Sequence, residues 1–164
     1  MEKILIIDAE KCSGCKQCEF VCSYIKEKMF SPIRSRIKVT RIDEVGINIP
    51  IICQHCVEPI CMDVCPVKAI YRDEQSGAIV INGDICVGCR TCFNVCPIGA
   101  IQINIDNKKV MKCDLCGGEP ECVKACTYGA LEFIDISRAS MEKRKNKIKN
   151  IANVYDNIFA IKKQ

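Results

Sequence analysis

The stretch Cys86-Val-Gly-Cys89-Arg-Thr-Cys92-Phe-Asn-Val-Cys96-Pro97 decides the fold of this protein. Three cysteines follow one another at two-residue gaps, and a fourth comes after three more residues, directly before a proline. This spacing is typical of thiolates that hold iron–sulfur cubes. In such runs the fourth cysteine ligates a second cluster, so one run predicts a partner run elsewhere in the sequence.

All sixteen cysteines fall into four such groups. The groups are Cys12, Cys15, Cys18 and Cys22; Cys53, Cys56, Cys61 and Cys65; Cys86, Cys89, Cys92 and Cys96; and Cys113, Cys116, Cys122 and Cys126. Four sets of four thiols match four [4Fe–4S] clusters. Zinc is the competing metal, but structural zinc usually takes two close cysteine pairs separated by a longer spacer. Two of these groups instead pack four thiols into eleven residues, which favours iron–sulfur clusters.

The fourth-cysteine rule also assigns ligands to each cluster. The second and third groups are neighbours and both end in Cys-Pro, so we expect them to exchange fourth cysteines. The first and fourth groups remain and are expected to pair likewise. The expected ligand sets are Cys53, Cys56, Cys61 with Cys96; Cys86, Cys89, Cys92 with Cys65; Cys12, Cys15, Cys18 with Cys126; and Cys113, Cys116, Cys122 with Cys22.

Short apolar runs separate the cysteine groups and predict strands. They lie at residues 3–7, 67–70 with 78–81, 100–105 with 109–111, and 130–134, the last available to pair with 4–7. Residues 23–52 contain no cysteine. Their alternating and β-branched second half allows a hairpin, but a surface excursion that covers cluster edges is the interpretation we favour.

The expected fold class is therefore α+β, with two nested bacterial-ferredoxin-like modules of two clusters each, short hairpins and a C-terminal helix. The outer module takes residues 1–22 and 113–136, and the inner module takes 53–112, with 23–52 as a connecting excursion or hairpin. Residues 137–164 contain neither glycine nor proline and place apolar residues at helical intervals after a basic run. They predict an amphipathic helix that packs on the protein itself or on a partner subunit.

Composition restricts the expected cellular location and the kinds of binding partner. Only four apolar residues, Ile4 to Ile7, follow the charged start, and no stretch is apolar for long enough to span a membrane. We therefore expect a cytoplasmic protein whose thiols are held by metal rather than by disulfides. The formal charge of +4 falls to about −4 once four clusters and their thiolates are counted, so it does not indicate nucleic-acid binding.

Three motifs resemble the four-cluster iron–sulfur subunits of the dimethyl-sulfoxide-reductase type. They are Cys53-Gln-His-Cys56-Val-Glu-Pro-Ile-Cys61, the central run and Lys112-Cys-Asp-Leu-Cys116. The resemblance covers residues 4 to about 134. It implies nested modules and a molybdenum or tungsten enzyme, a formate dehydrogenase or a hydrogenase as partner. The short gap from Cys116 to Cys122, and Thr127 in place of proline, favour a compact, soluble member.

A cluster with four cysteine ligands has no open coordination site for substrate, and the sequence contains no nucleotide-binding or nucleophile–base motif. The predicted function is electron transfer, without catalysis, between a larger catalytic oxidoreductase subunit and a one-electron carrier such as a ferredoxin or a flavin subunit. The first choice of partner is a tungsten- or molybdenum-pterin aldehyde oxidoreductase in an anaerobic organism. A hydrogenase or carbon-monoxide dehydrogenase, a conductive filament of copies of this protein, and a redox or iron sensor are the alternatives.

A few other residues lie close to the predicted ligands. His55 is the only histidine, and its place inside a cysteine loop predicts packing or hydrogen bonding near sulfur rather than catalysis. The basic residues Lys16, Lys68 and Arg90 are candidates for raising cluster potentials or for meeting a partner, although most such groups are simply solvated.

Overall fold

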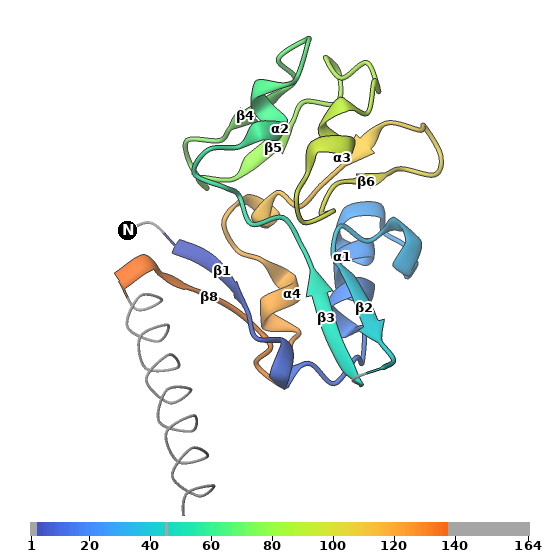
Figure 1. The fold of residues 1–164 in the computed structure, drawn as a ribbon, viewed down its shortest axis with the longest axis vertical. Coiled ribbons are helices and arrows are strands. Elements are labelled where there is room, and N and C mark those ends of the chain that lie inside the picture. Colours follow the sequence, from blue (N-terminus) through green and yellow to red (C-terminus); the bar gives the residue numbers. More distant parts are fainter. Residues whose placement is uncertain (1–2, 45, 138–164) are drawn as a thin grey trace, which may run out of the picture. The chain divides into compact units, whose positions relative to one another are not determined.

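The computed structural model describes residues 3–44 and 46–137 (Figure 1). The protein forms two compact units, a larger one of residues 7–132 and a smaller one made by the two ends, residues 1–6 and 133–164. The helix expected over 137–164 lies outside the described residues, apart from Ser137.

The two ends of the described polypeptide meet in a two-stranded sheet. Strand β1 (Lys3–Ile7) pairs with β8 (Leu131–Asp135). The ammonium of Lys3 lies 5.9 Å from the centroid of the Phe133 ring, a cation–π contact across this pair. The predicted pairing of the strand at 130–134 with residues 4–7 is confirmed.

One half of the larger unit contains helix α1 (Gln17–Glu27), helix α4 (Glu121–Lys124) and a hairpin of β2 (Lys38–Ile42) with β3 (Ile47–Ile51). The hairpin is antiparallel, with Lys38 opposite Ile51. Ile37, Pro50 and Ile52 are fully buried at its base. This stretch therefore forms the hairpin that its alternation allowed and contributes to the core, instead of merely covering the surface. Two 3-10 turns, η1 (Ala9–Lys11) and η2 (Pro32–Arg34), flank α1.

The other half contains two short helices, α2 (Ile60–Asp63) and α3 (Thr91–Val95), and two antiparallel hairpins. The hairpins are β4 (Ile70–Arg72) with β5 (Ile79–Ile81), and β6 (Gln102–Ile103) with β7 (Val110–Met111). The 3-10 turn η3 (Leu115–Gly117) follows β7. Both predicted hairpins are confirmed, with strands shorter than the apolar runs that predicted them.

Helices carrying cysteines pack against each other in matching pairs (Figure 1). Helix α1 contacts α4, and α2 contacts α3. Each helix contains the third cysteine of one group, so the contacts join the first group to the fourth and the second group to the third.

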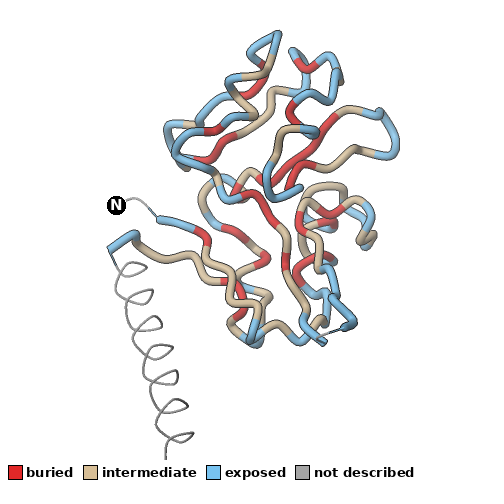
Figure 2. The backbone as a smooth tube through the Cα atoms, in the orientation of Figure 1, coloured by how far each residue is buried: buried red, intermediate tan, exposed pale blue. Residues whose placement is uncertain are grey.

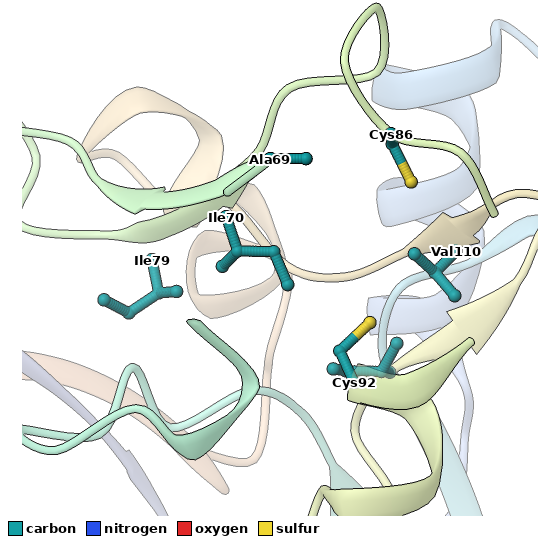
Figure 3. Packing of buried hydrophobic residues seen from close by; sticks show 7 residues of the cluster. Ala69, Ile70, Ile79, Cys86, Cys92 and Val110 are labelled. Atoms are coloured by element: carbon teal, nitrogen blue, oxygen red, sulfur yellow. The ribbon is translucent and has the colours of Figure 1, made fainter. Parts of the chain in front are cut away.

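Small aliphatic side chains and thiols share the core of the second half. Ala69, Ile70, Ile79, Ile101 and Val110 pack with the buried residues Cys86 and Cys92. In Figure 3 the sulfurs of Cys86 and Cys92 point into the same space, beside Ile70 and Val110. Figure 2 shows these buried segments inside the half and the loop tips exposed. The aliphatic side chains of this core therefore also shield the thiols from water.

Candidate metal centres

Two hollows in the larger unit are each lined by four cysteines. One is lined by Cys65, Cys86, Cys89 and Cys92, among apolar residues that include Ala69, Ile70 and Val110. The other is lined by Cys12, Cys15, Cys18 and Cys126. Each hollow thus gathers three cysteines of one group with the last cysteine of another. These are two of the four sets that the fourth-cysteine rule puts together.

The remaining eight thiols also lie in two sets of four. Burial raises the pKa of Cys61, and negative charge on Cys53, Cys96 and Cys56 raises it further. Burial likewise raises the pKa of Cys122, and negative charge on Cys113, Cys22 and Cys116 raises it further. Electrostatic influence of this kind requires proximity. The structure therefore gathers two of the expected sets around hollows, electrostatic influence links the members of the other two, and the role of all sixteen cysteines as ligands stays a prediction.

Neighbouring sets adjoin one another in a fixed order. The charge of Cys61 contributes to raising the pKa of Cys92, which burial raises to about 11. The charge of Cys53 acts on Cys113, whose pKa burial raises to about 12. Cys18 acts in the same way on Cys122. These electrostatic influences give the sets an order, from the set of Cys86 at one end to the set of Cys12 at the other, and this order is called the row below.

Backbone N–H groups point at several of these sulfurs. Ala69 N–H donates to Cys65 Sγ at 3.2 Å, and Ala100 N–H donates to Cys96 Sγ at 3.4 Å. Both donors lie four residues after the cysteine, in the repeated Cys-Pro-x-x-Ala phrase. The sulfurs of Cys53, Cys113 and Cys22 accept from the N–H groups of His55, Leu115 and Arg36 at 3.3–3.4 Å. Such donors stabilise thiolate charge.

The loops that join the first three cysteines of a group use left-handed backbone. Gly14 and Gly88 have φ of +74° and +72°, and the basic residues Lys16 and Arg90 have φ of 60° and 65°. These two basic residues are the N-caps of α1 and α3. An added Cβ on Gly14 would lie 2.7 Å from Asn48 Oδ1, so only glycine fits there without displacement. The sequence shows the basic side chains at these positions but not the strained backbone that carries them.

Lys112 is a buried cation between two thiol sets. Its ammonium donates to the carbonyl of Ile79 and, at 3.0 Å, to that of Cys113. The residue is only 5% exposed. Its positive charge acts to lower the pKa of both Cys61 and Cys113, which belong to different sets. In the sequence, Lys112 is only the first residue of the motif Lys112-Cys-Asp-Leu-Cys116. Nothing in the sequence predicts that its side chain is buried.

His55 is held by the core strand β5. Ile79 N–H donates to His55 Nδ1 at 2.9 Å, while the buried Nε2 has no protein partner among the described residues. Burial lowers the pKa of His55 to about 3, helped by the charge of Lys112. The ring is therefore neutral, and because Nδ1 accepts, its proton is on Nε2. The predicted hydrogen-bonding role is confirmed for Nδ1, and Nε2 is an orphaned donor inside a cysteine loop.

These features fit [4Fe–4S] clusters. Burial raises the pKa of Cys18 to about 12, so four crowded thiolates require a cationic core to neutralise them. The N–H donors to sulfur and the orphaned Nε2–H would serve the same charge. Within the described ranges, no three Cys, His, Asp or Glu side chains are spaced to hold a single metal ion. A cube holds its thiolates farther apart than one ion does, so this spacing is compatible with clusters.

Comparison with known proteins agrees with this chemistry. The family model of the 4Fe-4S dicluster domain matches residues 45–136. The polyferredoxin-like subunit of the aliphatic sulfonate oxidoreductase of Pyrococcus furiosus is 40% identical over 114 residues, which cover 70% of this protein and 65% of that one. A subunit of the anaerobic dimethyl sulfoxide reductase of Escherichia coli is 33% identical over 127 residues, covering 67% of this protein and 59% of that one.

A third relative matches over more of its length. An uncharacterized ferredoxin of Methanocaldococcus jannaschii is 38% identical over 145 residues, covering 88% of this protein and 79% of that one. The sequence thus spans less than two thirds of the first two relatives and most of the third. None of the described helices has the length and apolar character needed to cross a bilayer.

Proposed function

Because the protein belongs to the 4Fe-4S dicluster domain family and holds more than one [4Fe–4S] cluster, we propose that it relays single electrons for a larger catalytic oxidoreductase subunit. The observation that carries this proposal is the pair of hollows, each lined by three cysteines of one group and the last cysteine of another. When bound, each cluster would supply a one-electron step between its 2+ and 1+ states.

Four clusters and two nested modules are part of this proposal. The inner module, residues 53–112, would hold clusters at Cys53, Cys56, Cys61 with Cys96 and at Cys86, Cys89, Cys92 with Cys65. The outer module, residues 1–22 and 113–136, would hold them at Cys12, Cys15, Cys18 with Cys126 and at Cys113, Cys116, Cys122 with Cys22. The contacts of α2 with α3 and of α1 with α4 support the nesting. Residues 23–52 would connect the modules.

The protein's own part is to position, shield and charge these sites. Aliphatic residues such as Ile70, Ile79 and Val110 exclude water from the thiols. Backbone N–H groups and Lys112 supply positive potential that favours the reduced, more negative state. Cys89 and Cys15 of the two end sets are exposed, as is Cys56 of a middle set. We assign entry and exit of electrons to the two end sets because they lie farthest apart in the order of the sets.

The relatives support an oxidoreductase as partner. Two of them are subunits of an aliphatic sulfonate oxidoreductase and of a dimethyl sulfoxide reductase. A tungsten- or molybdenum-pterin enzyme, including the aldehyde-oxidising type, is accordingly the partner we propose. A cytoplasmic location is part of the same proposal.

Isolation from native cells without oxygen tests the partner. Tungsten or molybdenum in a copurifying large subunit is the expected result. Nickel would indicate a hydrogenase or carbon-monoxide dehydrogenase instead. An iron-loaded protein that comes out alone, or as filaments, would contradict a catalytic partner.

Paired serine variants test the ligand sets. Cys96→Ser should disturb the same electron paramagnetic resonance signal as Cys53→Ser, although the two positions belong to different cysteine groups. Cys65→Ser should instead disturb the signal that Cys86→Ser disturbs. If Cys96→Ser and Cys86→Ser affect the same cluster, each group holds its own cube and the nested arrangement is wrong.

A further inference from the structure

One end of the row of thiol sets opens to solvent through the loop of residues 86–89. Cys89 is exposed, and Val87 beside it is 65% exposed. Ile85, just before the loop, is 48% exposed. A thiol that is reachable from solvent and surrounded by apolar side chains gives a short path for an electron and a small contact for a partner.

Basic side chains gather around this opening. Arg90 lines the same hollow as Cys65 and Cys89, and Lys68 directly follows another lining residue, Val67. The tip of the β6–β7 hairpin backs onto the loop, since an added Cβ on Gly88 would lie 3.8 Å from Lys109 Cγ and 4.0 Å from the carbonyl oxygen of Lys108.

In the described part of the protein these cations have no carboxylate partners. Among the described residues, none of Lys68, Arg90, Lys108 and Lys109 forms an ion pair, although the ammonium groups of Lys108 and Lys109 donate to backbone carbonyls. Asp84 is the acidic residue of the neighbouring loop. The four basic side chains therefore outnumber this acidic residue, and the surface side chains of this face are positive on balance.

The opposite end of the row differs in charge. Cys15 is exposed there too, so the two ends are equally open to electron exchange. Lys11, however, is paired with Asp8 at 3.1 Å and with Glu132 at 3.6 Å. Glu10 is exposed in η1, shortly before this cysteine group. Acidic as well as basic side chains therefore lie at this end.

We propose that a small one-electron carrier protein with an acidic face docks on the basic end, over Cys89 and Val87. The proposal rests on the relay function proposed above and adds which end meets the carrier and the charge of that carrier. One electron passes from the terminal site of Cys65, Cys86, Cys89 and Cys92, which is oxidised, to the carrier, which is reduced, or in reverse. No bond forms and no proton moves. The opposite end is left for the catalytic subunit.

Electrostatic attraction of this kind speeds association and weakens as salt rises. A transient contact with an apolar centre and a charged rim suits a carrier that must leave after each electron. The carrier's own negative charges would replace the missing carboxylate partners of Arg90 and Lys68.

Charge reversal at the two ends tests the proposal. The test variant is Lys68→Glu with Arg90→Glu. The control is Lys16→Glu, because Lys16, like Arg90, directly follows the second cysteine of its group and has positive φ. The full-length protein is reconstituted with iron and sulfide, and equal iron content is checked first. Electron transfer to an oxidised acidic two-cluster ferredoxin is then followed by stopped flow at low and high salt.

The expected result is a second-order rate lowered about tenfold or more at low salt in the double variant, with most of the salt dependence gone. Lys16→Glu should change the rate less than twofold. Equal rates in all three proteins would overturn the docking surface, and so would slowing in Lys16→Glu alone. Faster exchange with a basic carrier than with the acidic one would also overturn it. Failure to bind iron at all would instead refute the relay function, so the two failures are distinguishable.

Discussion

The orphaned donor of His55 predicts a change in one cluster potential. His55 Nε2–H is buried without a protein partner among the described residues, in the loop between Cys53 and Cys56. A sulfide or thiolate of the cluster proposed for that loop is the acceptor we expect. The reduced cluster carries one more negative charge, so this hydrogen bond is stronger after reduction and raises the potential. His55→Leu removes the donor and should lower that potential.

The size of the change follows from the strength of one hydrogen bond. If reduction strengthens the bond by about 0.5–1.5 kcal/mol, the range of a typical net hydrogen bond, the potential falls by about 20–65 mV, because 59 mV corresponds to a tenfold change for one electron. The same substitution leaves the buried Ile79 N–H without its acceptor at 2.9 Å, which costs about 1–3 kcal/mol of stability.

A redox titration followed by electron paramagnetic resonance measures the potential of each cluster. Gln54→Leu is the matched control, because Gln54 lies in the same loop but is exposed and donates only to Ile52 O. The control should leave every cluster potential unchanged. An unchanged or higher potential in His55→Leu, or equal shifts in all clusters, would refute the reasoning.

The other predictions concern charge and backbone. Lys112→Met should lower the potentials of both middle clusters, because the Lys112 ammonium acts on the sets of Cys61 and of Cys113. Lys112→Arg keeps the positive charge and should leave both potentials nearly unchanged. A titration in which only the end clusters shift would count against this prediction. Gly14→Ala should lower the free energy of unfolding by about 2–3 kcal/mol, from left-handed strain plus displacement of Asn48. Gly99 also has a left-handed backbone, with φ of +61°, but the space around an added Cβ is open. Gly99→Ala is therefore expected to lower the free energy of unfolding by only about 1 kcal/mol. Equal losses for the two variants in anaerobic thermal unfolding would contradict the role of Asn48.

The two cysteine sets that line hollows could be predicted from the sequence because ligand spacing is local. Two-residue gaps force three sulfurs to one side of a loop, and the leftover fourth cysteine, such as Cys65 or Cys96, then needs a partner group. The hairpins were also predictable, since apolar runs flank turn residues such as Asp73 and Gly77. The start of β4 at Ile70 was not, because Cys65 to Lys68 form a turn in which Lys68 N–H donates to Cys65 O.

Long-range contacts left no local signal. Helix α1 continues past Cys22 to Glu27, where the cysteine pattern alone gave no reason for a helix. Glu19 within it is 3% exposed and accepts from Val39 N–H at 2.6 Å. A glutamate is ordinarily exposed to solvent, and the β2 strand, 20 residues further along the sequence, makes Glu19 a buried acceptor. The burial of Lys112 likewise depends on a contact distant in the sequence, its hydrogen bond to the carbonyl of Ile79.

Iron and acid-labile sulfide per protein molecule, measured after anaerobic reconstitution together with zinc, test the central claim most directly. Four clusters predict about sixteen irons and about sixteen sulfides per molecule, with no zinc. About eight irons would mean that only one of the two proposed modules holds clusters. Zinc without sulfide would contradict the iron–sulfur relay altogether.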